Sequence, residues 1–362
     1  MQAKNLCFYL SDHGFGHIAR NIPLIAEAVH RTNGFVYVVC GERHLEFAKA
    51  NLLELLTPEQ FSRIRYRAEH TDIGLILRQG TLLVDTAALT DACAQYLAEL
   101  PERAKQEAEW LRQQEIAAAL CDMPLWSISA CEQAGVPLLY VGNFTWTELY
   151  REFLPEYIWK AYAAEYRKIQ HGVLYALHNP EMLEFLPRAE LSATSLVARP
   201  FHPDEIRTIR ARHTCPVVFV ALGMSAQFTR PVSVEGVEAH FYVTEGVPLT
   251  GSNVTVIPYS TLHTQDYVAA ADYVITKAGW GTVAECLLAQ KPMALFARDS
   301  VLEDRTTIRK LEQKKLGTKV TYEQLTEMSD LLEQMKQITY PAVPEYHNAA
   351  AEIVSKLLTL TE

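Results

Sequence analysis

Two short stretches of the chain place residue types that can do chemistry directly after an expected strand. The first is "LSDHGFGHIARN", residues 10–21, which follows the apolar run "NLCFYL". It combines glycines with Asp12, His13, His17 and Arg20. Imidazole changes its charge near neutral pH, so a histidine in this position is suited to moving a proton. A glycine turn between a strand and a helix lets a ligand approach the backbone closely.

The second stretch is "TKAGWGTVAE", residues 276–285, which places Gly279 and Gly281 before Thr282 and Glu285. The free N–H groups at a helix start suit a phosphate. A glutamate one turn later can accept hydrogen bonds from the two hydroxyls of a ribose. The stretch therefore indicates a nucleoside diphosphate site, and the alternative is a plain helix start with a glutamate favoured by the helix dipole.

The first stretch is a poor dinucleotide fingerprint. The pattern G-x-G-x-x-G has its third glycine replaced by Ala19, and Phe15 and His17 are bulky for a pyrophosphate cradle. A nicotinamide or flavin enzyme is therefore disfavoured.

Strand and helix signals alternate on both sides of these turns. Ile18, Ile22, Ile25 and Val29 recur at helical spacing and predict one buried helix face. The runs "GFVYVVCGE", "EIAAALCDM" and "VPLLYVGN" read as strands, "PLWSISACEQAG" as a helix, and residues 150–180 as one or two amphipathic helices. Strand signals return in "CPVVFVALG", "AHFYVTEG" and "NVTVIPY". The order predicts an α/β protein with two parallel-sheet, Rossmann-like domains joined near "SLVARPFHPDE".

Length and composition agree with two globular domains. The chain has 362 residues, 49% of them hydrophobic and 21% charged, and its formal net charge is −10. We expect no nucleic-acid partner from this charge. No apolar run reaches the roughly 18 residues that span a bilayer, so no transmembrane segment is expected. The seven cysteines form no C-x-x-C pair. They predict buried free thiols in a cytoplasmic protein. The oligomeric state stays open.

Several segments of the sequence also resemble segments of a known superfamily. "VITKAGWGTVAECLLAQKPMALF" resembles the nucleotide-sugar signature of GT-B glycosyltransferases, both the plant UDP-glycosyltransferases and the lipid-II-forming N-acetylglucosaminyltransferase. "HGFGHIAR" resembles their first N-terminal loop. The chain is most similar to the glycosyltransferase-like N-terminal half of plant arabinokinase and its bacterial stand-alone relatives, through "HTDIGLILRQGTLLVDTAAL", "GVPLLYVGNFTWTELY", "LVARPF" and "ARDSVLEDRTTIRKLEQKKLG" in the same order.

The resemblance implies a GT-B fold of two Rossmann-like domains that face each other across a cleft. Residues 1–196 would bind the acceptor and residues 197–342 the nucleotide-sugar donor. The last helix, in 343–362, would pack back on the first domain, in line with the apolar spacing of Tyr346, Ala350, Ile353 and Leu357.

The resemblance also assigns roles to residues of the first domain. His17 matches the catalytic base of plant UDP-glycosyltransferases, and Asp122 matches the aspartate that orients it. His13 is a rival base, and the alternative role of His17 is a helix cap or a phosphate ligand. The remaining candidates for the acceptor side are Asp12, Arg20, Asn143 and Trp146; Asp12 and Arg20 are alternatively ordinary surface charges, and Trp146 a packing residue.

In the second domain Lys277 stands where plant enzymes have a histidine that faces the diphosphate; its alternative is an exposed strand-end lysine. Glu303 and Asp304 fall near the acidic pair that grips the donor sugar. The full set expected at the donor is Gly16, Gly223, Ser225, Ile257, Tyr259, Lys277, Gly279, Gly281, Thr282, Glu285, Glu303 and Asp304. Ile257 and Tyr259 would lie against the base.

Two absences favour one mechanism. The sequence has no D-x-D triplet, so we expect no metal and no cofactor beyond the nucleotide-sugar substrate. Retaining GT-B enzymes commonly have a glutamate eight residues before Glu285, where this chain has Lys277. We therefore predict an inverting, metal-independent glycosyltransferase that uses a nucleotide-diphospho sugar, with UDP as the expected nucleotide. The alternatives are a nucleotide-sugar hydrolase, which shares the pattern G-x-G-H-x-x-R, an epimerase of GT-B fold, and a non-catalytic sugar-nucleotide sensor.

Overall fold

The computed structural model describes residues 4–79, 81, 83–222, 231–296 and 298–362. Contacts divide the chain into two compact units. Unit 1 comprises residues 1–77, 84–197 and 348–362, and unit 2 comprises residues 78–83 and 198–347. No helix among the described residues is long and apolar enough to cross a membrane.

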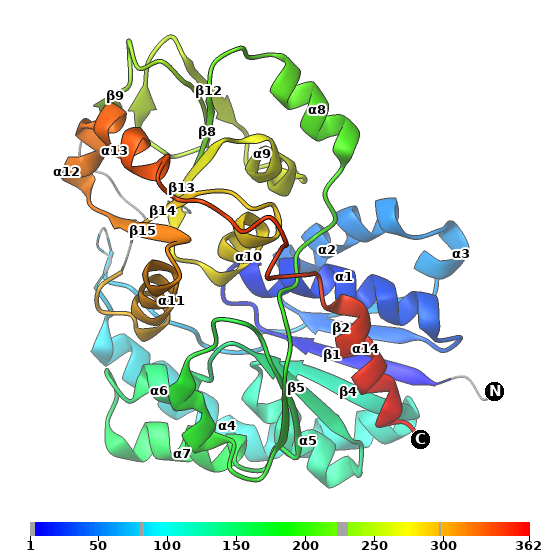
Figure 1. The fold of residues 1–362 in the computed structure, drawn as a ribbon. Helices are drawn as coiled ribbons and strands as arrows, with labels where there is room; N and C mark the ends of the chain where they lie inside the picture. Colours follow the sequence, from blue (N-terminus) through cyan, green and yellow to red (C-terminus); the bar gives the residue numbers. More distant parts are fainter. Residues whose placement is uncertain (1–3, 80, 82, 223–230, 297) are drawn as a thin grey trace. The chain divides into compact units, whose positions relative to one another are not determined.

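Unit 1 is built on a parallel sheet covered by helices (Figure 1). Among the described residues its strands follow the order β3-β2-β1-β4-β5-β6-β7, and every ladder in it is parallel. The strands are β1 (Asn5–Leu10), β2 (Val36–Cys40), β3 (Ile64–Ala68), β4 (Ile116–Asp122), β5 (Leu138–Gly142), β6 (His171–Leu174) and β7 (Glu190–Ala193). The helices are α1 (Phe15–Arg31), α2 (Glu42–Leu55), α3 (Pro58–Phe61), α4 (Thr86–Gln113), α5 (Leu125–Ala134), α6 (Trp146–Tyr150), α7 (Glu156–Tyr166), a 3₁₀ turn (Pro180–Phe185) and α14 (Ala350–Thr359).

Unit 2 repeats this plan with a parallel sheet in the order β12-β10-β8-β13-β14-β15 over its described residues. Its strands are β8 (Val217–Ala221), β10 (His240–Thr244), β12 (Val254–Ile257), β13 (Tyr273–Lys277), β14 (Met293–Phe296) and β15 (Gly317–Val320), with the small pair β9 (Val232–Ser233) and β11 (Leu249–Thr250) apart from them. Its helices are α8 (Pro203–Ala211), α9 (Thr264–Ala270), α10 (Trp280–Leu288), α11 (Leu302–Gln313), α12 (Tyr322–Thr326) and α13 (Met328–Met335). The predicted pair of parallel-sheet domains is confirmed.

Each sheet changes direction of winding beside its first strand. In unit 1 the chain moves outward from β1 through β2 to β3, then returns to pair β4 with the other edge of β1. In unit 2, β8 lies in the same way between β10 and β13. Ligands of doubly wound sheets bind at this switch point, outside the carboxyl ends of the strands. The fold therefore marks the loops that follow β1, β4, β8 and β13.

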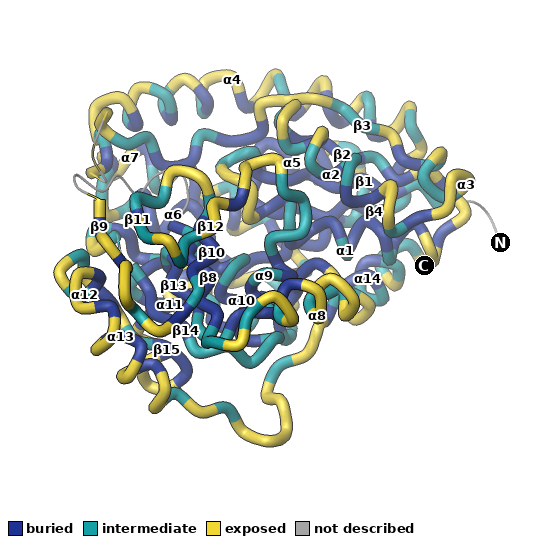
Figure 2. Tube along the Cα trace, turned by 90° about the horizontal axis from the view of Figure 1, so that it is seen from above, coloured by how far each residue is buried: buried dark blue, intermediate teal, exposed yellow. Residues whose placement is uncertain are grey.

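The predicted helix face of α1 is present. Ile18, Ile22, Ile25 and Val29 are all fully buried in the structure. The central strands β1, β4 and β5 are buried along almost their whole length, and the long helix α4 alternates between buried and exposed residues (Figure 2). The prediction for residues 150–180 was wrong in part, because α7 ends at Tyr166 and residues 171–174 form β6. The aromatic helix pattern before it hid a strand of only four residues.

Helix α14 belongs to unit 1 although unit 2 precedes it in the chain. It lies against α1 (Figure 1), and Arg31 of α1 donates to Ser355 Oγ at 2.7 Å. Leu196 and Asn348 form a parallel bridge where the chain leaves and re-enters the unit. Tyr346 lies outside the helix, which begins only at Ala350.

We predict that Leu357→Ala lowers the free energy of unfolding of the chain by about 3 kcal/mol, because it opens a cavity under a fully buried side chain of α14. The matched control is Leu53→Ala in α2, where the leucine is 60% exposed and the change should cost less than about 0.5 kcal/mol. Urea unfolding followed by circular dichroism measures both. Equal losses in the two variants would contradict the packing of α14 on unit 1.

Candidate functional site

The glycine turn after β1 is held in a conformation that few other residues adopt. Gly14 caps α1 with φ 75° and ψ 162°, in the left-handed half of the backbone map. It starts α1 so that His17, Arg20 and Asn21 follow at intervals of three and four and share one face of the helix. That face points at the end of β4, the neighbouring strand, where Asp122 is paired in register with Leu10.

These side chains form one buried network, which we call the His17 cluster: His17, Arg20, Asn21, Asp122 and Asn143. The two carboxylate oxygens of Asp122 accept from His17 Nδ1 at 2.9 Å, Arg20 Nε at 2.7 Å, Arg20 Nη2 at 2.5 Å and Asn21 Nδ2 at 2.5 Å. Arg20 Nη1 donates to Asn143 Oδ1 at 2.8 Å. The cluster brings together His17, Asp122, Arg20 and Asn143, all named from the sequence; Asn21 was missed, although its spacing of four from His17 was visible.

The electrostatics of the cluster rest on Asp122. Its side chain is fully buried, and burial alone would raise its pKa. The charges and hydrogen bonds of Arg20 and His17 outweigh that effect and hold the pKa of Asp122 well below its usual range. The Arg20 guanidinium lies 5.1 Å from the ring centre of Tyr175, which adds a cation–π contact. Asp122 is thus a fixed anion in a dry setting, able to orient the imidazole of His17.

Asp12 and His13 lie beside the cluster in a second network. Asp12 accepts from His70 Nδ1 at 2.8 Å and from Thr71 Oγ1 at 3.0 Å. Burial would raise the pKa of Asp12, but the hydrogen bond and charge of His70 more than offset it and lower the pKa. The imidazole of His13 packs edge-on against Trp146, with 5.5 Å between ring centres.

Trp146 is a core residue of unit 1. Its side chain is 1% exposed, it stacks on Tyr150, and its indole N–H donates to Asp72 Oδ2 at 2.9 Å. Asp72 also accepts from Ser11 Oγ at 3.0 Å, so Trp146 and the turn after β1 share a buried carboxyl. Burial raises the pKa of Asp72, and the charge of Asp12 raises it further.

The donor candidates of unit 2 gather around the start of α10. Gly279 is the N-cap of this helix and, within the described residues, no side chain caps it; Gly281 and Thr282 lie in the first turn, at the positive end of the helix dipole. Lys277 ends β13, and its Cε lies 3.3 Å from where a Cβ on Gly279 would be. The lysine stem therefore runs along the helix start.

Lys277 is the electrostatic centre of this group. Within the described part of the chain its ammonium has no hydrogen-bond or ion-pair partner. Burial lowers the pKa of Lys277 and the nearby charge of Arg298 lowers it further, whereas the charges of Asp304 and Glu303 oppose this shift. An anion bound at the start of α10 would act in the same direction as the two carboxylates and favour the charged lysine.

The other described donor candidates of unit 2 have distinct environments. Asp304 is fully buried and accepts from the backbone N–H, Nε and Nη2 of Arg298 at 2.9, 3.0 and 2.7 Å. Its carboxylate is thereby engaged within unit 2, whereas its neighbour Glu303 is half-buried. Ile257 is buried, and Tyr259 is 60% exposed, so Tyr259 presents its ring at the surface. Gly223 and Ser225 lie outside the described residues, and Gly16 is in the first turn of α1.

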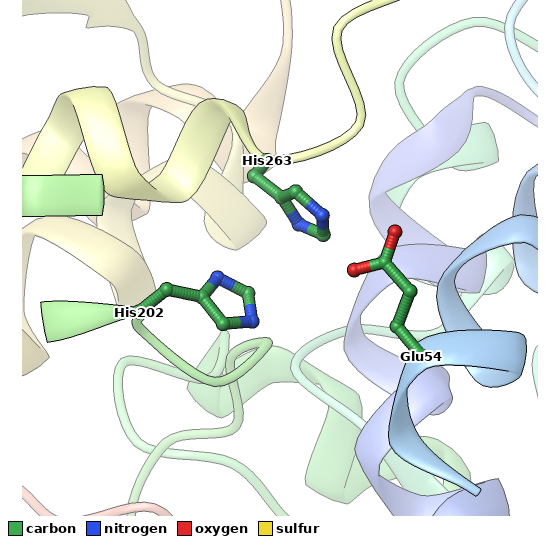
Figure 3. Close-up of side chains that lie close together, drawn as sticks. All are labelled: Glu54, His202 and His263. Carbon is green, nitrogen blue, oxygen red and sulfur yellow. The ribbon is translucent and has the colours of Figure 1, made fainter. Parts of the chain in front are cut away.

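Glu285 is nearly buried, with 7% exposure, and forms an ion pair with Arg199 at 3.2 Å between Oε1 and Nη2. Arg199 was missed as a site residue, although its segment "LVARPF" contributed to the resemblance. Near it His202 and His263 pack their rings 4.6 Å apart (Figure 3). His202 Nδ1 is bonded to Asp266 at 2.8 Å.

The geometry can be compared with known proteins. Residues 227–360 match the model of the glycosyltransferase family 28 C-terminal domain. The L-arabinokinase of Arabidopsis thaliana is 23% identical over 321 residues, which are 83% of this chain and 29% of that protein. The chain thus spans under a third of the length of this curated relative.

Solved structures show the same fold. Phytolacca americana UGT2, complexed with UDP-2-fluoro-glucose and pterostilbene, matches with TM-score 0.65 and 11% identity over 99% of this chain and 100% of that one. UDP-glucose:anthocyanidin 3-O-glucosyltransferase, in complex with UDP, matches with TM-score 0.65 and 12% identity over 99% of each chain. The chain has the GT-B fold, as predicted.

We predict that Asp122→Asn lowers the free energy of unfolding by about 3–5 kcal/mol, because it leaves the buried Arg20 guanidinium without its counter-charge. The double variant Arg20→Gln/Asp122→Asn removes both charges and should recover part of the loss. Thermal and urea unfolding at pH 7 measure both. A loss below about 1 kcal/mol in the single variant would show that the pair is not desolvated as described.

A second prediction concerns Glu148, which follows Trp146 in α6 and is fully buried. Burial raises its pKa to about 8, in spite of the hydrogen bond from the Thr145 N–H at 2.8 Å. Between pH 5 and 8 the folded chain then binds one proton more than the unfolded chain at this site, so its contribution to stability falls as pH rises. Glu148→Gln should flatten that slope by about 1.4 kcal/mol per pH unit.

Urea unfolding at half-unit steps of pH tests this. Glu156→Gln, at an exposed glutamate of α7, is the matched control and should leave the wild-type slope unchanged. The same slope in wild type and Glu148→Gln would mean that Glu148 is ionised in the fold.

Proposed function

We propose that the chain is an inverting glycosyltransferase that transfers a sugar from a UDP-sugar to a hydroxyl acceptor without a metal. Unit 2 binds the donor and unit 1 provides the base. The observation that carries the proposal is the 2.9 Å hydrogen bond between His17 Nδ1 and Asp122 Oδ1 at the switch point of unit 1. The GT-B relatives whose complexes contain UDP or a UDP-sugar support the donor class.

The bond to Asp122 fixes which nitrogen of His17 acts. When Nδ1 carries the proton and donates it to Asp122, Nε2 has a free lone pair. Nε2 then takes the proton of the acceptor hydroxyl while the hydroxyl oxygen forms a bond to the anomeric carbon and the bond to the diphosphate breaks. One displacement from the opposite face inverts the anomeric centre.

Arg20 limits how far Asp122 can act on His17. Its guanidinium contacts both oxygens of Asp122, so the pair as a whole is close to neutral. Arg20 Nη2 is also 3.0 Å from His17 Nδ1 and competes for that nitrogen. We infer that Asp122 mainly selects the ring orientation and tautomer of His17, and stabilises the imidazolium only modestly.

The leaving group is the second chemical problem. Breaking the glycosidic bond leaves an extra negative charge on UDP, which the ammonium of Lys277 and the amides at the start of α10 would stabilise. These groups provide the positive charge that a metal ion provides in other glycosyltransferases. The exposed ring of Tyr259 is suited to stacking on a base, and Glu285 to binding the ribose hydroxyls.

A second candidate function uses the same residues with water as the acceptor. Gly14, Gly16, His17 and Arg20 satisfy the pattern G-x-G-H-x-x-R of nucleotide-sugar hydrolases, and Arg20 is part of the His17 cluster. Release of free sugar from a UDP-sugar in the absence of acceptor would favour the hydrolase over the transferase. Metal independence is checked in the same assay by adding EDTA.

We predict that His17→Ala lowers kcat by about 10²–10⁴-fold, because it removes the general base, and changes the Kd for UDP less than threefold. Glu285→Ala should instead raise the Kd for UDP about tenfold, since it removes hydrogen bonds to the ribose. Calorimetric titration with UDP gives the affinities, and UDP release from a panel of UDP-sugars gives the rates. Equal loss of UDP affinity in both variants would contradict the division of roles.

A further inference from the structure

Arg199 ties the first residues of unit 2 to the helices that form its candidate donor site. It lies two residues after Val197, the last residue of unit 1 in this part of the chain, and its side chain is 5% exposed. Its Nη1 donates to the carbonyl of Leu262 at 2.5 Å. Its Nη2 donates to Thr264 Oγ1 at 3.1 Å and to Glu285 Oε1 at 3.2 Å. One guanidinium thus joins three segments that are far apart in sequence.

Two of these contacts fix the guanidinium independently of Glu285. Leu262 and Thr264 lie on either side of His263, the N-cap of α9. The backbone and side chain of His202, three residues after Arg199, are bonded to Asp266 in the first turn of the same helix. The rings of His202 and His263 pack against each other beside these contacts (Figure 3). Arg199 therefore presents Nη2 to Glu285 from a rigid support.

Glu285 needs such a partner because it is buried in α10. Burial raises the pKa of Glu285; Arg199 opposes this effect, and the charge of Asp266 on α9 adds to it. Asp266 is itself bonded to His202. Without Arg199 the carboxyl would hold its proton at higher pH and would lose acceptor capacity. Among the described residues, none donates to Glu285 Oε2.

We propose that Arg199 is a positioning residue for the donor: it holds Glu285 through Oε1, so that Oε2 faces the vicinal hydroxyls of a nucleotide ribose as an ionised acceptor. This inference rests on the proposed function, in which Glu285 binds the donor ribose. It makes the entry segment of unit 2 a determinant of nucleotide affinity, although Arg199 does not itself touch the nucleotide.

The test compares UDP with 2′,3′-dideoxy-UDP, which lacks both ribose hydroxyls, by calorimetric titration of the full chain. We expect Arg199→Met and Glu285→Gln each to weaken UDP binding about tenfold and to leave dideoxy-UDP binding unchanged. The double variant should be no weaker than either single variant. The ratio of the variant Kd to the wild-type Kd for UDP should rise for Arg199→Met as pH falls from 8 to 6, because Glu285 then gains a proton.

Two further variants keep the test sharp. Arg207→Met makes the same chemical change at a largely exposed arginine of α8 and should bind both nucleotides like the wild type. Arg199→Lys keeps the positive charge, so the ratio of its Kd for UDP to the wild-type Kd should stay constant between pH 8 and 6. This variant is measured if Arg199→Met does not fold.

The outcomes separate the inference from the function beneath it. If Arg199→Met weakens UDP and dideoxy-UDP equally, or binds UDP like the wild type while Glu285→Gln does not, the positioning role is wrong and the donor site stands. If the wild-type chain does not bind UDP, or binds it no better than dideoxy-UDP, the proposed ribose site itself is wrong.

Discussion

The buried carboxylate of Asp122 is the constraint on which unit 1 is organised. A charge that is fully removed from water costs several kcal/mol unless it is paired and hydrogen-bonded on all sides. Here α1 supplies every donor that the structure gives the carboxylate, from His17, Arg20 and Asn21. The glycine turn, the direction of α1 and the register of β1 with β4 must all be right before the charge is satisfied. The same arrangement anchors His17 through Nδ1, which is the geometry that the proposed base role requires.

Unit 2 solves a related problem with the charges reversed. Lys277 is a cation with little solvent around it, and the start of α10 beside it carries the positive end of a helix dipole. An anion bound there would interact favourably with both the lysine and the helix start. Glu285, one turn further along α10, is by contrast already paired with Arg199. In the proposed function, the diphosphate would bind beside Lys277 and the start of α10, and the ribose beside a carboxylate that Arg199 already holds.

Much of this could be read from the sequence because local signals and global fold agree. The apolar spacing of α1, the strand runs and the two glycine turns each identify an element and its place in a βαβ order. His17 and Asp122 could be paired only through a resemblance, since 105 positions separate them and no local pattern links the two. Arg199 was missed because its role depends on burial and on partners from distant segments. Strand β6 was not predicted because a run of four residues after an aromatic helix is too short to show the alternation of a strand.

The return of the chain to unit 1 has a consequence for how the molecule is made. Unit 1 is interrupted by about 150 residues, and its last helix, α14, covers α1 only after unit 2 has been synthesised. Unit 2, continuous apart from residues 78–83, has its six-stranded sheet complete before α14 leaves the ribosome. During translation the apolar seat of Ile353, Val354 and Leu357 therefore stays open on the surface of the nascent chain. Unit 1, which is synthesised first, can therefore be completed only after unit 2 has been synthesised.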